Sequence, residues 1–417
     1  MKEFTAKYRR RILTFMAVFG PATIAAMADN DAAGVATYSL AGAKLGYPVL
    51  FLLSIIVILL AITQEMGIRL ALVSRKGLAD HIRENHGITV AVAVFICLFL
   101  ANLGTIVTNV AAVKTSSQIL NFPPIIAIIA VIVLAFVFVT RGNYRMNQNI
   151  MLFVSLFYVS YIISAFLSKP NWLTAITNLI FPHGVDVNIE YLKNYLILGL
   201  GVLGTTVTPW GQFFISSFAF DKKIEVEKLK YAQAETYGGA LLTNFFTFFM
   251  MIAAIATLYI HGIPLESGEQ AAMAIRPFAG NSASTVFAIG ILSAGFMGMV
   301  VVSLTTAYAF SEFFGYSGSL DASYRRSRVF YTLFLIQLVL AGIIAMIPNV
   351  SLLSMAILTQ GINALILPIV LYFLMSFTNN SKIMGDKVNN NWQKNIATGA
   401  IYFISIAAFL ALIFNIF

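Results

Sequence analysis

The chain has 417 residues, of which 59% are hydrophobic and only 10% are charged, a composition that few soluble folds could bury and that predicts an integral membrane protein. The formal net charge of +9 would also suit a nucleic-acid binder, but the basic residues fall between the apolar runs, which indicates membrane topology and no nucleic-acid partner. The single cysteine, Cys97, excludes an internal disulfide framework and a cysteine metal cluster.

Apolar windows predict eleven membrane-spanning helices, two of which are broken. In chain order they cover residues 13–43 (broken), 46–73, 88–118, 123–140, 147–168, 190–220 (broken), 235–260, 282–314, 328–347, 351–376 and 395–416. No small-residue cleavage site follows the first run, so we expect a retained span and not a signal peptide. With a cytoplasmic N-terminus, 21 of the 26 Lys and Arg residues fall inside, which places the C-terminus outside.

The first span is interrupted by polar residues in the run GPATIAAMADNDAAGVATYSLAGAKLGY, which carries Asp29, Asn30 and Asp31. A carboxylate at membrane depth is costly and therefore indicates a functional site. Asp is also a favoured N-cap, so the alternative is that one carboxylate merely begins the second half-helix, and Asp29 is the better candidate for that role than Asp31. The pattern leaves open which of the two faces the site.

The sixth span has a second interruption, GVLGTTVTPWGQFFISS, which carries Thr205, Thr206, Thr208 and Pro209. A broken helix frees backbone carbonyls, which are tolerated at membrane depth only where they line a cavity or meet a ligand. The alternative role for the threonines is hydrogen bonding to carbonyls of their own helix. Together with the first break, these oxygens form a hard ligand set that suits Mg²⁺, Ca²⁺ or Mn²⁺ rather than soft metals.

The spans divide into two equal halves, residues 13–168 and 190–376, each of which begins with a broken helix. An odd number of spans in each half turns the second half upside down in the bilayer. This is typical of inverted-repeat secondary transporters, whose substrate binds at the midplane between the breaks. We therefore expect one transmembrane transporter domain over residues 1–417, with the eleventh span at 395–416 outside the repeat.

Other spans add polar side chains. The tenth span has Gln360 and Asn363 on one helix face. The third span has a polar stripe made of Asn102, Thr105, Thr108 and Asn109. The stripe would wet a vestibule, but interhelical hydrogen bonding explains both sets equally well. Glu65 and Glu312 are expected close to the membrane interfaces, and all four histidines fall in predicted loops.

These motifs give the chain a resemblance, nearly end to end, to the NRAMP family of divalent metal transporters, which share the leucine-transporter-type fold. Sliding Ala41-Gly42-Ala43 and Gly46-Tyr47 onto the family's first broken helix places its aspartate at Asp31 and its asparagine at Gly34. Residues 201–210 match the family's sixth-span pattern.

In that sixth-span match, the alanine that offers its carbonyl to the metal becomes Thr205, and the metal-binding methionine becomes Thr208. Gln360 takes the place of a glutamine near the ligands in the tenth span. The resemblance therefore implies a metal site composed of Asp31, Gly34, Thr205, Thr208 and Gln360.

Departures from the family pattern alter the expected cargo. Loss of the thioether removes the soft ligand that favours Mn²⁺ and Fe²⁺, and the small Gly34 and Thr208 should leave a roomier pocket that suits a partly hydrated Mg²⁺. The resemblance is closest to the NRAMP-related magnesium transporter branch. The family's third-span acids are Asn109 and Ala112 here, and its sixth-span histidines are Trp210 and Ile215, so we expect no proton coupling.

The expected protein is a uniporter that takes up divalent metal ions, Mg²⁺ and also Mn²⁺, by alternating access in a bacterial inner membrane. The metal is the substrate, no cofactor is expected, and a monomer is compatible with the sequence. The alternatives are an amino-acid or other small-solute carrier, in which Asp31 would repel the substrate carboxylate, and a proton-coupled Mn²⁺/Fe²⁺ transporter. An enzyme is not expected, because no nucleophile–base pair lies in the spans. A channel would need a symmetric oligomer.

Overall fold

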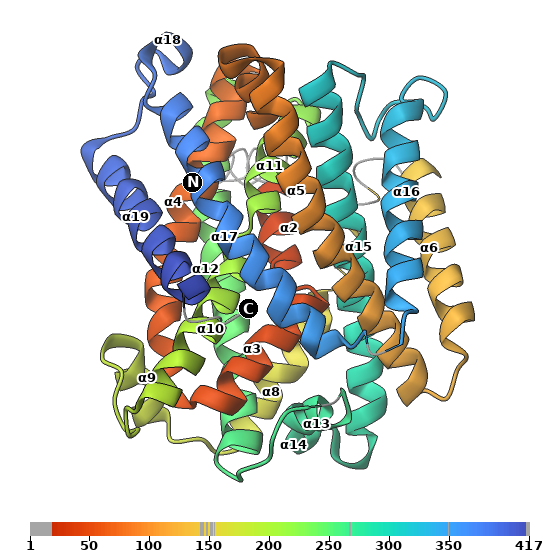
Figure 1. Ribbon diagram of the computed structural model, residues 1–417, viewed down its shortest axis with the longest axis vertical. Helices are drawn as coiled ribbons and strands as arrows, with labels where there is room; N and C mark the ends of the chain where they lie inside the picture. The colour runs from red at the N-terminus through yellow and green to blue at the C-terminus, as the bar shows by residue number, and fades with distance from the viewer. Residues whose placement is uncertain are drawn as a thin grey trace, which may run out of the picture.

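The computed structural model describes residues 19–141, 146, 149–150, 153, 155–266, 268–348 and 350–413. These residues form helices joined by short connections, and no strand occurs among them (Figure 1). The helices are α2 Pro21–Ala28, α3 Ala32–Leu45, α4 Leu50–Ser74, α5 Leu78–Ile119, α6 Pro124–Arg141, α8 Val159–Leu167, α9 Trp172–Ile180, α10 Ile189–Thr206, α11 Pro209–Asp221, α12 Leu229–Ala254, α13 Gly268–Ala272, α14 Arg276–Ala279, α15 Ala283–Phe314, α16 Arg328–Ala345, α17 Leu352–Thr378, α18 Ser381–Met384 and α19 Asn391–Ile413.

Seven helical segments of the described part are long and apolar enough to cross a membrane. They are Tyr47–Ser74, Leu78–Ile119, Pro124–Arg141, Val226–Tyr259, Gly280–Phe314, Arg328–Ala345 and Leu352–Thr378. The two broken helices, α8 and α19 occupy the remaining predicted spans, as an all-helical polytopic membrane protein requires. Within the predicted spans, residues 13–18, 147–148, 151–152, 154 and 414–416 lie outside the described residues.

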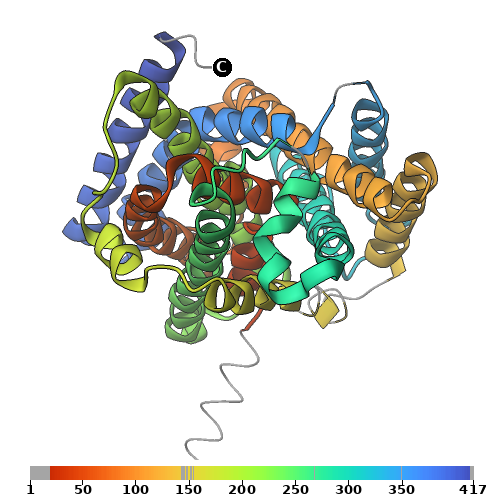
Figure 2. The same cartoon turned by 90° about the horizontal axis from the view of Figure 1, so that it is seen from below.

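Both predicted helix breaks are present. Residues 29–31 separate α2 from α3, and Val207 and Thr208 separate α10 from α11. The last helical hydrogen bond of α10 runs from Val207 N to Leu203 O at 2.8 Å, and Pro209, which has no N–H, begins α11. Seen end on, α2 and α3 lie inside the bundle, while α19 lies at one edge and α6 at the opposite edge (Figure 2).

The third span begins earlier than predicted, at Leu78, and α5 is kinked at Gly87, whose φ of +80° favours glycine. The prediction that all four histidines lie in loops is therefore wrong for His81 and His86, which lie in the helical residues before the kink. The residues from Leu78 to the kink are largely polar, so a search for apolar windows did not predict that they are helical.

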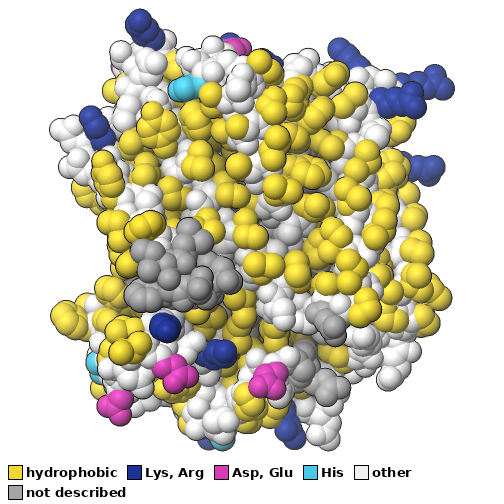
Figure 3. Space-filling model, in the orientation of Figure 1, with side chains coloured by type: hydrophobic (Ala, Val, Ile, Leu, Met, Phe, Trp, Pro, Cys, Tyr) yellow, Lys and Arg dark blue, Asp and Glu magenta, His cyan; other side chains and the backbone are white. Residues whose placement is uncertain are grey.

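The surface suits a lipid environment. Hydrophobic side chains cover the middle of the face in Figure 3, and most charged side chains gather toward its upper and lower ends. On α6, Ile125, Ile129 and Val133 are exposed large hydrophobic side chains. Contiguous apolar surface of this extent is typical of protein that is covered by a membrane.

Candidate metal-ion site

The first break is organised by Asp31. Its backbone is extended, and its side chain caps α3 by accepting a hydrogen bond from Gly34 N to Oδ1 at 2.9 Å. The sequence-based preference for Asp29 as the N-cap is therefore wrong: Asp29 ends α2, and Asp31 begins α3. Both carboxylates are buried.

The second oxygen of Asp31 is held by α5. Asn109 Nδ2 donates to Asp31 Oδ2 at 2.6 Å, and Asn109 Oδ1 accepts from Ala32 N at 3.1 Å. Asn109 fits tightly against α15, because a Cβ added to Gly298 would lie 2.5 Å from its amide nitrogen. Asn109 therefore fixes Asp31 and the start of α3. The sequence left two roles open for the polar stripe on α5, a vestibule or interhelical hydrogen bonding, and Asn109 makes interhelical hydrogen bonds.

Asn30, between the two carboxylates, points away from them. Its Nδ2 donates to Thr243 Oγ1 at 2.6 Å, and its Oδ1 accepts from Thr247 Oγ1 at 3.0 Å, both on α12. Its carbonyl accepts from the Tyr158 hydroxyl at 2.5 Å. These bonds anchor the unwound segment to neighbouring helices and satisfy its polar groups, as buried polar groups require.

Asp29 faces the second break. Its Oδ1 accepts a long hydrogen bond of 3.4 Å from the Thr208 hydroxyl, and its Oδ2 is buried and accepts no hydrogen bond from any residue that the structure describes. Thr208 is the N-cap of α11 and accepts from Gly211 N at 2.9 Å. A buried carboxylate oxygen without a partner is costly, and a bound cation would satisfy it. The two breaks thus meet at the Asp29 carboxylate, whose Oδ1 bonds to Thr208 and whose Oδ2 is open to a ligand.

Gly34 and Thr205 pack where the two breaks approach each other. A Cβ on Gly34 would lie 2.5 Å from the carbonyl oxygen of Asp29 and 3.3 Å from Thr205 Oγ1. Gly34 therefore contributes space and a backbone donor, and no side-chain ligand. The absence of a side chain at Gly34 lets the Asp29 carbonyl lie close against α3.

Substituting Gly34 by Ala should therefore displace the Asp29 backbone. Overpacking of this kind costs about 1–3 kcal/mol, and a cost of that size at the site would weaken metal uptake roughly 5- to 150-fold at low metal concentration. Gly238→Ala is the matched control, because a Cβ there meets nothing within 4 Å. Uptake by Gly34→Ala vesicles at the rate of the control would show that this contact does not shape the site.

The tenth-span residues approach from α17. A Cβ on Gly204 would clash with the carbonyl oxygen of Gln360, so α17 passes close to the end of α10. The Gln360 side chain is buried, and its Oε1 accepts from Asn363 Nδ2 at 2.8 Å. Gln360 therefore lies beside the second break, with its side-chain oxygen already bonded within α17.

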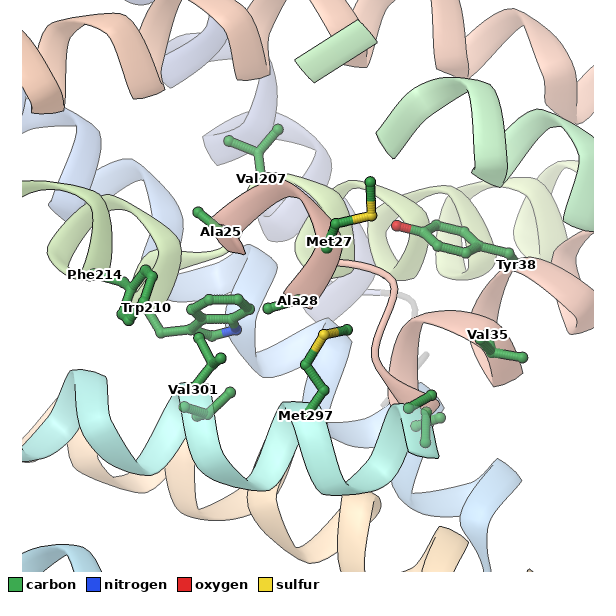
Figure 4. Packing of buried hydrophobic residues seen from close by; sticks show 14 of the residues in the cluster. Ala25, Met27, Ala28, Val35, Tyr38, Val207, Trp210, Phe214, Met297 and Val301 are labelled. Carbon is green, nitrogen blue, oxygen red and sulfur yellow. The ribbon is translucent and has the colours of Figure 1, made fainter. Parts of the chain in front are cut away.

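Apolar side chains enclose the polar segment. In Figure 4, Trp210 of α11 lies beside Ala28, Phe214 of α11 and Val301 of α15 lie next to Trp210, and Met297 reaches from α15 toward the first break. Met297 was not identified from the sequence. No group of three or more His, Cys, Asp or Glu side chains able to hold a metal occurs in the described part of the chain. The site can therefore offer two carboxylates and several uncharged oxygens, a set that leaves coordination places for water.

Comparison with known proteins identifies relatives along almost the whole chain. A family model described as natural resistance-associated macrophage protein-like (Nramp) matches residues 22–414. The divalent metal cation transporter MntH of Yersinia pestis (strain Pestoides F) is 25% identical over 384 residues, with 90% of this chain and 89% of the relative covered. MntH of Bacillus subtilis (strain 168) is 26% identical over 398 residues, with coverage of 92% and 88%.

Solved structures show the same fold. The Eremococcus coleocola manganese transporter superposes with a TM-score of 0.75 at 19% identity and covers 95% of this chain and 86% of its own. A Na⁺-coupled sialic acid symporter has a TM-score of 0.58 at 11% identity, with coverage of 94% and 90%. These likenesses establish the leucine-transporter-type fold, with two inverted five-helix repeats that each begin with a broken helix.

Proposed function

The chain belongs to the Nramp family, and from this we propose that it takes up Mg²⁺, and also Mn²⁺, by alternating access and without proton coupling. Members of the family are transporters of divalent metal ions and not enzymes, and the metal is substrate rather than cofactor. The MntH relatives are named for divalent metal transport, and the structural neighbour is named a manganese transporter.

The proposed site lies between the breaks, and the observation that carries it is the buried Asp29 Oδ2, which has no hydrogen-bond donor among the described residues. We propose Asp31, Gly34, Thr205, Thr208 and Gln360 as the residues that bind or shape the site, and Asp29 as the second carboxylate. Asp29 would contact the ion, and Asp31 would supply charge from a position held by Gly34 N and Asn109. The Thr208 hydroxyl, the Thr205 carbonyl and water complete the coordination.

The hard oxygen set supports Mg²⁺ as cargo. Thr208 offers a hydroxyl where a thioether would favour softer metals. Mg²⁺ dehydrates reluctantly and usually keeps several waters, so two carboxylates with neutral oxygens suffice for it. Mn²⁺ also accepts carboxylate, carbonyl and water ligands, which is why it remains a second cargo.

The surroundings of the carboxylates support uptake without protons. The neighbour of Asp31 on α5 is the amide of Asn109, and Trp210 follows the second break, and neither side chain titrates. A proton could not be passed from the carboxylates to the side chain at either position. The membrane potential supplies roughly 2.3 kcal/mol per charge per 100 mV, or about 4.6 kcal/mol for a divalent ion.

The topology is part of the proposal. We propose a bacterial inner membrane location, with the N-terminus in the cytoplasm and the C-terminus outside. Residues 13–168 and 190–376 would be the two repeats of a single domain, with 395–416 as an added helix. A monomer would carry a complete site, since both breaks come from one chain.

Purified protein in proteoliposomes tests the cargo and the coupling together. We expect Mg²⁺ to enter when the lumen is negative, Mn²⁺ to enter as well, and each to compete with the other. A pH-sensitive dye in the lumen should stay constant during uptake. Acidification in step with the metal would replace this proposal by the proton-coupled Mn²⁺/Fe²⁺ alternative, and Mn²⁺ uptake that excess Mg²⁺ leaves unchanged would remove Mg²⁺ as cargo.

A further inference from the structure

An apolar groove of about 460 Å³ runs between α4, α10 and α19. These helices lie on the side of the molecule opposite α6 and α16 (Figure 1). Ile55 of α4, Leu200 of α10 and Phe403 of α19 are among its walls. Ile55 and Phe403 are 46% and 64% exposed, so the groove opens to the surroundings of the membrane-spanning helices. Those surroundings are lipid, and apolar chains are the occupants available there.

The groove adjoins a more polar hollow of about 360 Å³ at the start of α19. Ile58 of α4 lines both, so the two hollows are neighbours along α4. The second hollow is lined by Asn390, Trp392 and Gln393 together with Tyr237 of α12. Along α19 the lining therefore changes from polar and aromatic to apolar. Trp and Tyr prefer the headgroup level of a membrane, which marks this hollow as the interfacial end.

The segment that leads into the polar end carries an excess of positive charge. Lys382, Lys387 and Lys394 are all exposed, and Asp386 is the one acidic residue between residues 381 and 394. Asp386 is paired with Lys387 at 2.6 Å, which leaves Lys382 and Lys394 in excess. Exposed Lys side chains near a membrane surface attract anionic lipid by about 1 kcal/mol each.

We propose that this groove is a binding site for one anionic phospholipid. An acyl chain lies along α4, α10 and α19, and the phosphate headgroup lies at Trp392 and Lys394. Lys394 follows directly on the polar and aromatic lining of the second hollow, and the lining of the groove beyond it is apolar, which matches the order of groups along a phospholipid. The residues that line the two hollows do not include those of the helix breaks. The outcome of a lipid-binding test therefore does not depend on the proposal for metal transport.

Gly399 leaves room in the groove for the first atom of a side chain. It lines the groove, and a Cβ added there meets nothing within 4 Å. Gly238 on α12 is the matched control, because an added Cβ there also meets nothing within 4 Å and the residue lines neither hollow. Both Gly→Leu substitutions raise helix propensity equally, so a difference between them reports on the groove.

The experiment measures lipid retained by full-length protein, purified with phosphatidylglycerol or phosphatidylcholine and examined by native mass spectrometry. We expect Gly399→Leu to bind phosphatidylglycerol roughly tenfold more weakly than Gly238→Leu, the effect of displacing about two methylene groups. Lys394→Gln should reduce the preference for phosphatidylglycerol. Equal retention by both Gly variants would overturn the proposal, as would equal retention of both lipids by the unmodified chain. A dimer that Gly399→Leu dissociates would assign the groove to a second copy instead.

Discussion

Replacing Asp29 with Asn is expected to lower metal uptake to the level of protein-free vesicles. The substitution keeps the size of the side chain and an oxygen that can accept from Thr208, but removes the charge next to which the cation would lie. At an effective dielectric constant of about 20, two unit charges about 4 Å apart attract by roughly 4 kcal/mol. A loss of that size lowers affinity by roughly a thousandfold.

Asp186→Asn provides the matched control. Asp186 lies in the exposed connection between α9 and α10, so this variant loses the same charge outside both breaks and should transport normally. Titration calorimetry with Mn²⁺ on detergent-solubilised protein separates lost binding from lost movement. Wild-type uptake by a monodisperse Asp29→Asn protein would remove Asp29 from the site.

Asp31 can be tested in the same assay by a swap with its hydrogen-bond partner Asn109, because the two side chains have similar size. Asp31→Asn should also abolish uptake, and it places an amide against the Asn109 amide nitrogen. Combining it with Asn109→Asp restores the hydrogen bond and the total charge but moves the carboxylate to α5. We expect the double variant to recover thermal stability and not uptake. Recovery of uptake would mean that Asp31 serves only to hold the start of α3.

The sequence predicted both helix breaks because their causes are local. Asp29, Asn30 and Asp31 offer side chains that compete with helical hydrogen bonds, and Pro209 cannot donate one. The choice of cap was not predictable in the same way. Asp29 and Asp31 are equally good caps by residue type, and which of them begins α3 depends on where the chain is held by other helices.

Those holding contacts come from distant parts of the chain. Asn109 is 78 residues from Asp31, and Thr243 is 213 residues from Asn30. A polar stripe on one helix predicts that this face has polar neighbours, but it does not predict which residues of the neighbouring helix make the contacts. The same reasoning explains why Met297 was missed, since a methionine in an apolar span carries no signal of which neighbour it meets.

Glu65 and Arg69 of α4 form a buried ion pair. The hydrogen bonds from this pair to other helices were also not predictable from the sequence. The sequence placed Glu65 close to an interface, yet its side chain has no exposed surface. Its oxygens accept from Arg69 Nε at 2.7 Å, from Gln233 Nε2 of α12 at 2.7 Å and from Gln393 Nε2 of α19 at 2.8 Å. Arg69 in turn donates to Asn389 Oδ1 at 2.7 Å and to the carbonyl of Lys387. One pair thus joins α4, α12, α19 and the segment before α19.

Arg69→Met should destabilise the protein by about 3–5 kcal/mol, because it leaves the Glu65 charge buried without its counter-ion. Scanning calorimetry of the purified protein in detergent measures the loss. Lys76→Met is the matched control: Lys76 and Glu84 also pair, at 2.6 Å, but both are well exposed, so the cost should stay below about 1 kcal/mol. The Glu65→Leu, Arg69→Met double variant should unfold at a higher temperature than Arg69→Met alone, since apolar replacement of a whole buried pair is often close to neutral. Additive losses in the double variant would show that the pair contributes mainly through its separate hydrogen bonds to α12, α19 and residues 387–389, and that its internal attraction is a minor part of what holds these helices together.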